Sequence, residues 1–387
     1  MVRVLVVDDR QDFVEEAARK INDVAEDAEV EPVTGDRLKD LVSVLVATQQ
    51  DGPTTDFDDF DIVVLDYDLT REGDIGLTTG ADIARLMRSH TKCGVIVLTN
   101  PFPGPGRERR FDLRLVGNLD LLSDFEVASE FLGNRGLWSE TGWPTFRPSP
   151  WPVVPDLVQR LDLVTSSIAK RLDEPLLSVV PELADHYEDL SSDDKQWLGA
   201  DVSALRVRDV GGSEHGTLSL LAPRGPASVP EEVLPRFVAS RLIKWLDLFV
   251  RVRGIALVDA AQLVSRRPDV LLEDAEPDGE GSLNDIIEPS ILDLRSDLSV
   301  WCSRTVWWAS AVSPDAIAGQ LGARRKRGID LVFAEDFSQF IPRDSARSYL
   351  LSIESAYRRR WLASEELLKK AGGEWQPDIQ PAQWLML

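Results

Sequence analysis

The chain has 387 residues, of which 43% are hydrophobic, and its 66 acidic side chains outnumber its 43 basic ones to give a net charge of −23. This length favours two or three domains with packed cores, and the negative field disfavours nucleic acids and anionic membranes as partners. Two cysteines exclude a disulfide framework and a cysteine-based zinc site. Three histidines without ligand-like spacing disfavour a histidine-based metal site or catalytic triad. Since no secretory leader or bilayer-length apolar run stands out, we expect a cytoplasmic protein.

The first hundred residues alternate strand and helix patterns. Residues 2–8 form a short β-branched apolar run, typical of a strand covered on both faces. Residues 10–24 place Phe13, Ala17 and Ile21 on one face of a predicted helix. Strand, helix, strand, helix and strand patterns follow at residues 28–34, 36–48, 61–66, 79–90 and 93–100. This alternation predicts an α/β fold with a doubly wound parallel sheet of five strands, in which Pro32 places its own strand near an edge.

Acidic side chains close two of these strands, and a hydroxyl group closes a third. Asp8 and Asp9 end the first strand, Asp66 ends the strand at 61–66, and Thr99 ends the one at 93–100. The carboxyl ends of parallel strands share one edge of the sheet, so we expect these side chains to meet there. Neighbouring carboxylates repel, and a cation, a helix N-terminus or exposure to water would offset that repulsion. Three clustered carboxylates favour a hard divalent cation, and the pattern therefore predicts a magnesium site.

After Asn100 the patterns become weaker. Residues 119–125 (LDLLSDF) predict one more strand, and residues 138–155, rich in proline and tryptophan, predict an ordered connector. Helical spacing dominates from there on, and within residues 292–312 it places Trp301, Thr305 and Trp308 on one core-facing helix face. We expect a first domain, a connector and a mainly α-helical second domain of unknown function, with bounds at residues 1–137, 138–155 and 156–387.

The N-terminal segments resemble the receiver domain of bacterial response regulators. VLVVDDR resembles the first strand of that family with its acidic pair, and DIVVLDYDL resembles the third strand with its phospho-accepting aspartate, at Asp66. VIVLTN resembles the fourth strand with its switch hydroxyl, at Thr99, and Gly80 matches the glycine that often begins the preceding helix. The resemblance covers the first domain only.

The resemblance implies a signalling protein of a two-component phosphorelay. Asp66 would attack a phosphohistidine of a sensor histidine kinase and become an aspartyl phosphate. Mg²⁺ would be held by Asp8 or Asp9 together with Asp66, and by the backbone carbonyl of Asp68. Thr99 would hydrogen-bond the new phosphate and so change the surface offered to the helical effector domain or another protein partner. A homodimer is left open.

One departure from the family keeps other functions open. The family places a lysine at the end of the fifth strand, but residues 93–169 contain no lysine. The corresponding stretch reads Leu122, Ser123, Asp124, where an acid would repel a phosphate. Arginines lie nearby in the sequence and could substitute for the lysine, namely Arg107, Arg109, Arg110 and Arg114. A first alternative is a phosphorylation-independent adaptor or scaffold, in which the carboxylates only cap strand ends. A second alternative is an enzyme with its site in the C-terminal half, at Glu335 and Asp336 or at the basic run 358–360.

Overall fold

The structure, a computed structural model, describes the greater part of the chain. The described residues are 1–51, 54–69, 79–100, 124–139, 146, 152–188, 190, 192, 195, 202–211, 229–248, 250, 256–275, 282–321, 331–334, 339–342 and 361–362. Contacts divide the chain into two compact units, built from residues 1–111, 115–139 and 153–245, and from residues 112–114, 140–152 and 246–387. These units are defined by contacts alone. That residues 1–137 and 156–387 form separate domains, with a connector at 138–155, remains a prediction. Within the described ranges, no helix has the length and apolar character needed to cross a bilayer.

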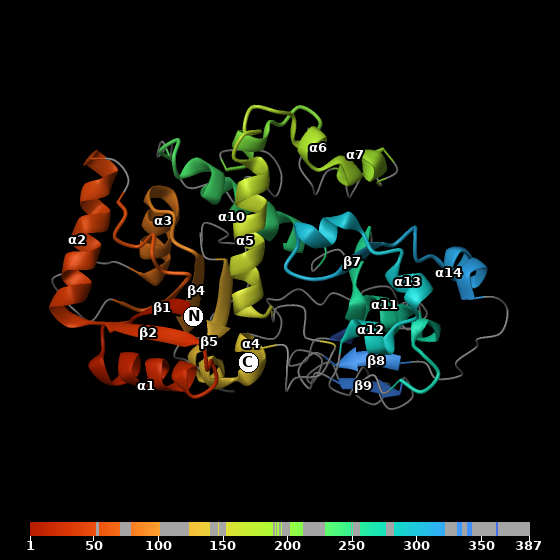
Figure 1. Cartoon of the computed structure of the whole chain (residues 1–387), viewed down its shortest axis with the longest axis horizontal. Helices are drawn as coiled ribbons and strands as arrows, with labels where there is room; N and C mark the ends of the chain where they lie inside the picture. Colours follow the sequence, from red (N-terminus) through yellow and green to blue (C-terminus); the bar gives the residue numbers. More distant parts are fainter. Residues whose placement is uncertain are drawn as a thin grey trace. The chain divides into compact units, whose positions relative to one another are not determined.

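A parallel sheet forms the centre of the first unit (Figure 1). Its strands follow the order β2-β1-β3-β4-β5, and each neighbouring pair is parallel. The strand bounds are Val2–Val7 (β1), Ala28–Val33 (β2), Ile62–Asp66 (β3), Val95–Asn100 (β4) and Phe125–Ala128 (β5). The predicted α/β class with a parallel sheet is confirmed. β2 is an outer strand, as expected from Pro32, which has no N–H to donate.

Helices cover both faces of this sheet (Figure 1). α1 (Gln11–Asn22) lies on one side, whereas α2 (Gly35–Asp51) and α3 (Gly80–His90) lie on the other. Thr79 begins α3 with a capping box, in which its hydroxyl accepts from the N–H of Asp82 and the Asp82 carboxylate accepts from the N–H of Thr79. The N–H of Gly80 donates over 2.9 Å to the carbonyl of Tyr67, which holds the start of α3 beside the end of β3.

The inward face of α1 lies one residue further along the helix than predicted. Val14, Ala18 and Ile21 are buried, whereas Phe13 and Ala17 are only half-buried. The apolar stripe of a helix spans several residue positions around the axis. The spacing of apolar residues therefore predicts that a helix is present more reliably than it predicts which residues lie at the centre of the buried face. As a result, the Phe13 ring lies at the margin of the helix, where it meets Arg10.

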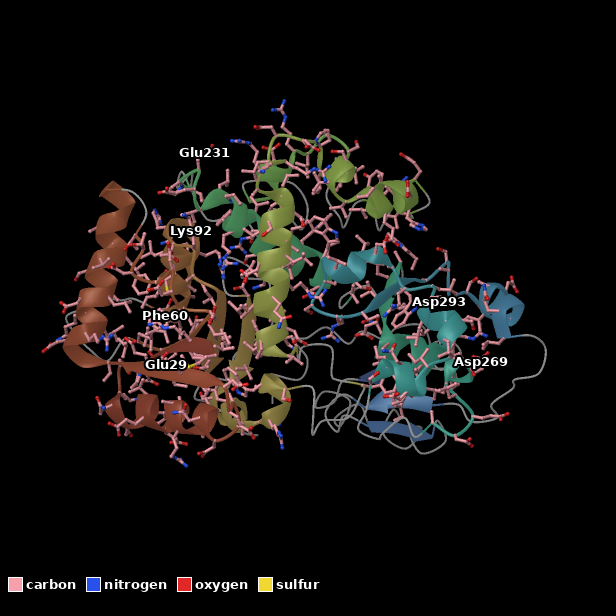
Figure 2. All side chains as sticks on the ribbon, viewed as in Figure 1. Glu29, Phe60, Lys92, Glu231, Asp269 and Asp293 are labelled. Atoms are coloured by element: carbon pink, nitrogen blue, oxygen red, sulfur yellow. The ribbon has the colours of Figure 1, made fainter. Side chains whose placement is uncertain are left out.

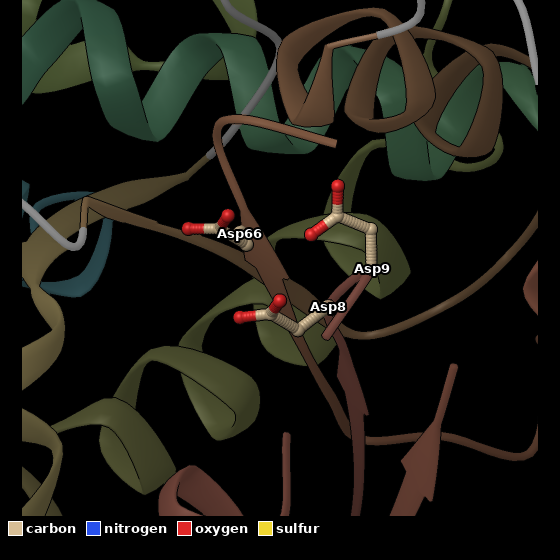
Figure 3. A group of neighbouring side chains, drawn as sticks. All are labelled: Asp8, Asp9 and Asp66. Atoms are coloured by element: carbon tan, nitrogen blue, oxygen red, sulfur yellow. The ribbon is translucent and has the colours of Figure 1, made fainter. Parts of the chain in front are cut away.

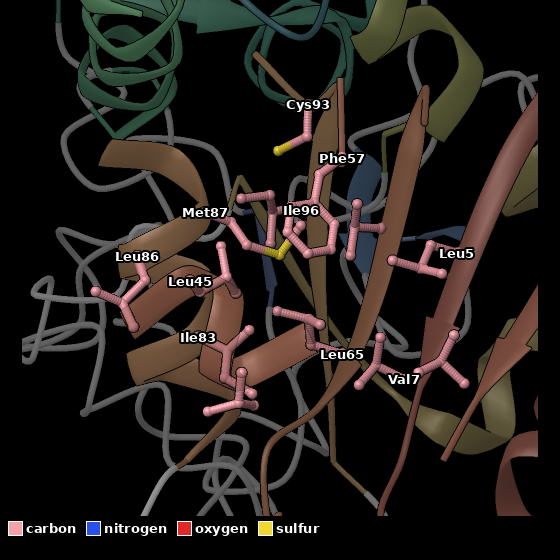
Figure 4. Close-up of a cluster of buried hydrophobic side chains, with 14 of the residues drawn as sticks. Leu5, Val7, Leu45, Phe57, Leu65, Ile83, Leu86, Met87, Cys93 and Ile96 are labelled. Carbon is pink, nitrogen blue, oxygen red and sulfur yellow. The ribbon is translucent and has the colours of Figure 1, made fainter. Parts of the chain in front are cut away.

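A hydrophobic core of the first unit lies between the sheet and α2 and α3 (Figure 4). Alternate strand residues face it, namely Leu5, Val7, Val63, Leu65, Ile96 and Leu98. The helices contribute Leu38, Val42, Leu45, Ile83, Ala84 and Met87. Because successive side chains of a strand point to opposite faces, Asp66 and Thr99 point away from this core. The apolar alternation thus determines on which face the polar strand ends lie.

The last strand of this sheet begins later than predicted. A strand was expected at residues 119–125, but β5 starts at Phe125, and Leu122 and Ser123 lie outside the described residues. Asp124 therefore precedes β5 and lies at the amino-terminal edge of the sheet, opposite to the edge that holds Asp66. The prediction that Asp124 would repel a phosphate at the site is wrong, because the two ends of a parallel strand lie at opposite edges.

Asp124 instead joins three elements at the amino-terminal edge. It forms a buried ion pair with Arg88 of α3, accepts a hydrogen bond of 2.7 Å from the N–H of Ile96, and accepts another from the hydroxyl of Ser240. Arg88 is fully buried and also donates to the carbonyls of Cys93 and Gly94. A buried charge needs such partners, so this junction stabilises the packing of α3 against β4 and β5.

Two longer helices reach the same edge, and the second of them belongs to the first unit up to residue 245. These are α5 (Val154–Ile168) and α10 (Leu234–Leu248), which carries Ser240. Arg236 of α10 pairs with Asp162 of α5, and its Nε donates over 3.2 Å to the carbonyl of Lys92, which is labelled in Figure 2. Shorter helices of this unit lie at Ser129–Gly133 (η2), Arg135–Trp138 (α4), Leu176–Val179 (α6), Pro181–Tyr187 (α7) and Val207–Gly211 (η3).

In its described part, the second unit combines short helices with two small antiparallel sheets, β6-β7 and β10-β8-β9. The strand bounds are Leu257–Asp259 (β6), Val306–Trp308 (β7), Leu331–Ala334 (β8), Gln339–Pro342 (β9) and Trp361–Leu362 (β10). The helices lie at Ala260–Arg266 (α11), Pro268–Val270 (η5), Leu283–Ile286 (α12), Pro289–Leu292 (α13), Asp297–Val300 (η6) and Pro314–Leu321 (α14).

The predicted helical face of Trp301, Thr305 and Trp308 is wrong. A short 3-10 helix ends at Val300, and Trp308 lies in β7, which pairs with β6. Trp307 is the fully buried tryptophan of this segment, and its Nε1 donates over 2.9 Å to the carbonyl of Ile291. β-Branched and aromatic residues favour a strand when a partner strand is present, and local spacing cannot reveal a partner distant in the sequence.

Replacement of Gly80 by alanine should destabilise the first unit. A Cβ at this position would lie 2.0 Å from the carbonyl oxygen of Asp66 and 2.9 Å from its carbonyl carbon, so α3 or the end of β3 would have to move. We expect Gly80→Ala to lower the free energy of unfolding by roughly 2 kcal/mol or more, measured by urea denaturation. Gly319→Ala in α14 is the control, because a Cβ there would meet nothing within 4 Å and should be neutral or stabilising. Equal effects of the two substitutions would contradict the prediction.

Candidate metal centre

Three carboxyl groups meet at the carboxyl ends of β1 and β3 (Figure 3). Asp8, Asp9 and Asp66 each offer an oxygen atom, and these atoms all lie within 4.8 Å of one another. The side chains come from positions far apart in the sequence, as the parallel-strand argument predicted. Such a set of oxygen ligands could hold a metal ion.

The register of the sheet brings these groups together. Val7 pairs with Leu65 across β1 and β3, so Asp8, the next residue, lies across from Asp66. Asp66 in turn pairs with Thr99 across β3 and β4. A shift of one residue in this register would turn alternate side chains to the other face, which the apolar core on that face prevents. The positions of Asp8, Asp66 and Thr99 therefore follow from the packing of the strands.

Burial makes this group of carboxylates electrostatically unfavourable. The exposed fractions of Asp8, Asp9 and Asp66 are 8%, 6% and 3%. Burial raises the pKa of Asp66 to about 8, and the charges of Asp8, Asp9 and Asp68 add to this shift, whereas the charge of Arg10 opposes it. Burial likewise raises the pKa of Asp8 to about 6. Asp66 Oδ2 has no hydrogen-bond partner among the described residues, so this atom is available to a ligand.

Arg10 provides positive charge beside the acid pair. Its Nε lies 3.7 Å from Asp8 Oδ1 and 3.9 Å from Asp9 Oδ1, and its backbone N–H donates to Asp8 Oδ1 over 2.9 Å. The guanidinium carbon lies 3.1 Å from the centroid of the Phe13 ring. α1 begins at the next residue, Gln11, so the positive end of the helix dipole also lies close by. A cation and a helix N-terminus therefore both oppose the repulsion between the adjacent carboxylates.

Thr99 and Asp68 lie in the immediate surroundings of the three carboxylates. The Thr99 side chain is buried, and its hydroxyl donates over 3.3 Å to the carbonyl of Leu65. Asp68 follows β3 by two residues, is half-buried, and acts on Asp66 through its charge. Gly80 reaches the same edge, where its N–H donates over 2.9 Å to the carbonyl of Tyr67. The predicted site residues of the first hundred positions are thus neighbours in space.

Sequence reasoning missed Arg10, although it directly follows the acid pair. The signal was a basic residue next to two acids at the start of a predicted helix. The other residues proposed for function lie outside the described residues, namely Glu335, Asp336, the basic run 358–360, and the arginines Arg107, Arg109, Arg110 and Arg114.

No family model, no curated protein and no solved structure matches the chain. A function for this protein therefore has to be argued from the geometry of its acid site.

Asp66→Asn should stabilise the metal-free protein at high pH. The pKa of Asp66 lies near 8 in the folded chain and near its ordinary value of 3.8 in the unfolded one, so the folded state binds the extra proton. The free energy of unfolding should therefore fall as pH rises from about 4 to about 8. Removal of this group should flatten that slope and raise the free energy of unfolding at pH 8 by a few kcal/mol, measured by urea denaturation with a chelator present.

Asp27→Asn serves as the control, because Asp27 is an exposed aspartate of the same unit. Parallel pH curves for the wild type, Asp66→Asn and Asp27→Asn would show that the Asp66 carboxyl is not strained by burial.

Proposed function

We propose that the chain is a response-regulator-like signalling protein in which Asp66 accepts a phosphoryl group, assisted by Mg²⁺ at Asp8, Asp9 and Asp66. One observation carries the proposal: a nearly fully buried carboxylate with an unpartnered oxygen lies against two other buried carboxylates. A site of this kind is unfavourable without a cation, and it presents an oxygen nucleophile next to that cation.

The topology of the sheet supports a receiver-like fold. The strand order 2-1-3-4-5 with helices on both faces is one of the common doubly wound arrangements, and its ligands bind at the carboxyl ends of the strands. The acid site occupies that edge, at β1 and β3, which are adjacent in the sheet. This agrees with the place at which a receiver domain would accept a phosphoryl group.

Each residue of the site has a role in the proposed reaction. An oxygen of Asp66 forms a bond to phosphorus while the bond from phosphorus to the donor atom breaks, and the donor leaves with that electron pair. The Thr99 hydroxyl then exchanges its bond with the Leu65 carbonyl for one to a phosphoryl oxygen. Asp8, Asp9 and Asp66 would hold the metal ion together with the Asp68 carbonyl. Bound Mg²⁺ would neutralise charge on the transferring group.

The helices after the connector are candidates for the responding element. α5 and residues 234–245 of α10 belong to the same compact unit as the sheet, and Ser240 and Arg236 tie α10 to Asp124 and to the Lys92 carbonyl. A change in β4 or β5 after phosphorylation would therefore act on elements already in contact with them. The phosphoryl donor would be a sensor histidine kinase.

A second candidate function is a scaffold that never carries phosphate. The observation that favours it is the end of β5, where Ala128 and Ser129 occupy the positions at which the family resemblance calls for a lysine. In this function the three carboxylates bind a metal ion or stay partly protonated, and the sheet with its helices offers a docking surface.

Phosphotransfer from acetyl phosphate separates the two functions. With Mg²⁺ present, we expect the wild-type chain to gain the mass of one phosphoryl group, detected by intact-mass spectrometry, and to release it in hydroxylamine as an acyl phosphate does. Asp66→Asn and the chelated wild type should gain nothing, and Asp27→Asn should behave as the wild type does.

A short-lived acyl phosphate could escape mass detection, so beryllofluoride with Mg²⁺ provides a second measurement through thermal stability. An unchanged mass together with an unchanged melting temperature would exclude phosphoacceptance and leave the scaffold.

A further inference from the structure

We propose that the Arg10 guanidinium is the phosphate-binding group of this site, and that it pairs with the phosphoryl oxygens once Asp66 carries them. This inference rests on the proposed phosphoacceptance at Asp66. In the family that the chain resembles, a lysine at the end of the fifth strand binds the phosphate. The described end of β5 has no cationic residue, and we assign this role to Arg10, which directly precedes α1.

The charge balance of the site calls for such a group. Three carboxylates and one divalent ion leave the site with about one negative charge. Phosphorylation replaces the single charge of Asp66 with nearly two on the phosphoryl group, so the site gains about one more negative charge. Arg10 is the cation whose charge already acts on both Asp8 and Asp66. Ala128, which ends β5, and Ser129, which begins η2, carry no charge to share this task. A phosphorylated Asp66 would therefore have Arg10 as its nearest described source of compensating charge beyond the metal ion.

The guanidinium is held in place but is not committed to the carboxylates. Its distances of 3.7 and 3.9 Å to Asp8 and Asp9 exceed hydrogen-bond length, so these contacts are electrostatic only. Among the described residues, the guanidinium donates no hydrogen bond. The Phe13 ring covers one face of the group, which leaves the N–H groups in the guanidinium plane uninvolved in this contact. Such an arginine, whose charge already acts on Asp66 with its buried and unpartnered oxygen, is suited to an arriving anion.

A competing role for Arg10 is that of a permanent counter-ion to the carboxylates. That role predicts tighter Mg²⁺ binding when the positive charge is removed, and no change in the response to a phosphoryl mimic once Mg²⁺ is saturating. The phosphate-binding role predicts that removal of the positive charge weakens the stabilisation by beryllofluoride and leaves the response to Mg²⁺ alone intact. The two roles therefore separate if Mg²⁺ alone and Mg²⁺ with beryllofluoride are titrated independently.

The experiment uses the full chain and four variants: Arg10→Gln, Arg10→Ala, Arg10→Lys and, as the matched control, Arg19→Gln. Arg19 is an exposed arginine of the same helix that pairs with Asp23. Thermal stability is followed first against Mg²⁺ alone and then against beryllofluoride at saturating Mg²⁺. We expect Arg10→Gln and Arg10→Ala to keep or improve Mg²⁺ binding and to need at least about tenfold more beryllofluoride for half-maximal stabilisation.

Arg10→Lys keeps the charge but loses the planar stack on Phe13, so it should recover part of the response. Arg19→Gln should match the wild type in both titrations. A beryllofluoride response of Arg10→Gln and Arg10→Ala equal to that of the wild type would overturn the inference and leave phosphoacceptance intact. Loss of the Mg²⁺ response in all three Arg10 variants would also overturn it, because Arg10 would then only hold the carboxylates in place. A wild type that ignores beryllofluoride would overturn the proposed function and this inference together.

Discussion

Mutual repulsion among three buried carboxylates is the constraint around which the first unit is organised. Asp8, Asp9 and Asp66 lie together because the strands that carry them are parallel, adjacent and fixed in register by an apolar core on the opposite face. The core residues between the sheet and α2 and α3 thus supply the free energy that holds the charges together. Asp66 illustrates the result, since one of its buried oxygens has no partner in the described chain and its pKa lies near 8.

Much of this arrangement could be predicted because it depends on local and periodic signals. The β-branched runs before Asp8 and Asp66 give strands, and the apolar spacing between them gives helices. Parallel strands then require their carboxyl ends to meet, which places Asp66 beside Asp8 and Thr99 without any further information. Pro32 marks an outer strand for the same kind of reason, since its missing N–H cannot join a ladder on both sides.

Other features depend on contacts that spacing cannot reveal. Asp124 follows an apolar run and so resembled the end of a strand, yet its partners are Arg88 and Ser240, which lie 36 and 116 residues away. Trp307 lies in β7 because β6 supplies a partner strand. The sequence shows a positive charge at Arg10 but not its contact with Phe13. That contact depends on how α1 is rotated about its axis, and the spacing of apolar residues determines this rotation only to within one residue.

The junction of Arg88, Asp124 and Ser240 bears on where this protein can be cut. A fragment that ended at residue 137 would retain the buried guanidinium and its carboxylate but lack the hydroxyl from α10. It would also lack the contact of Arg236 with the loop before β4 and would uncover the strand surface that α5 packs against. In such a fragment the ion pair at the amino-terminal edge of the sheet would be exposed to solvent, while the three repelling carboxylates would remain at the carboxyl-terminal edge. The shortest fragment that keeps all these contacts of the sheet therefore extends through the first turns of α10, well beyond the connector at 138–155.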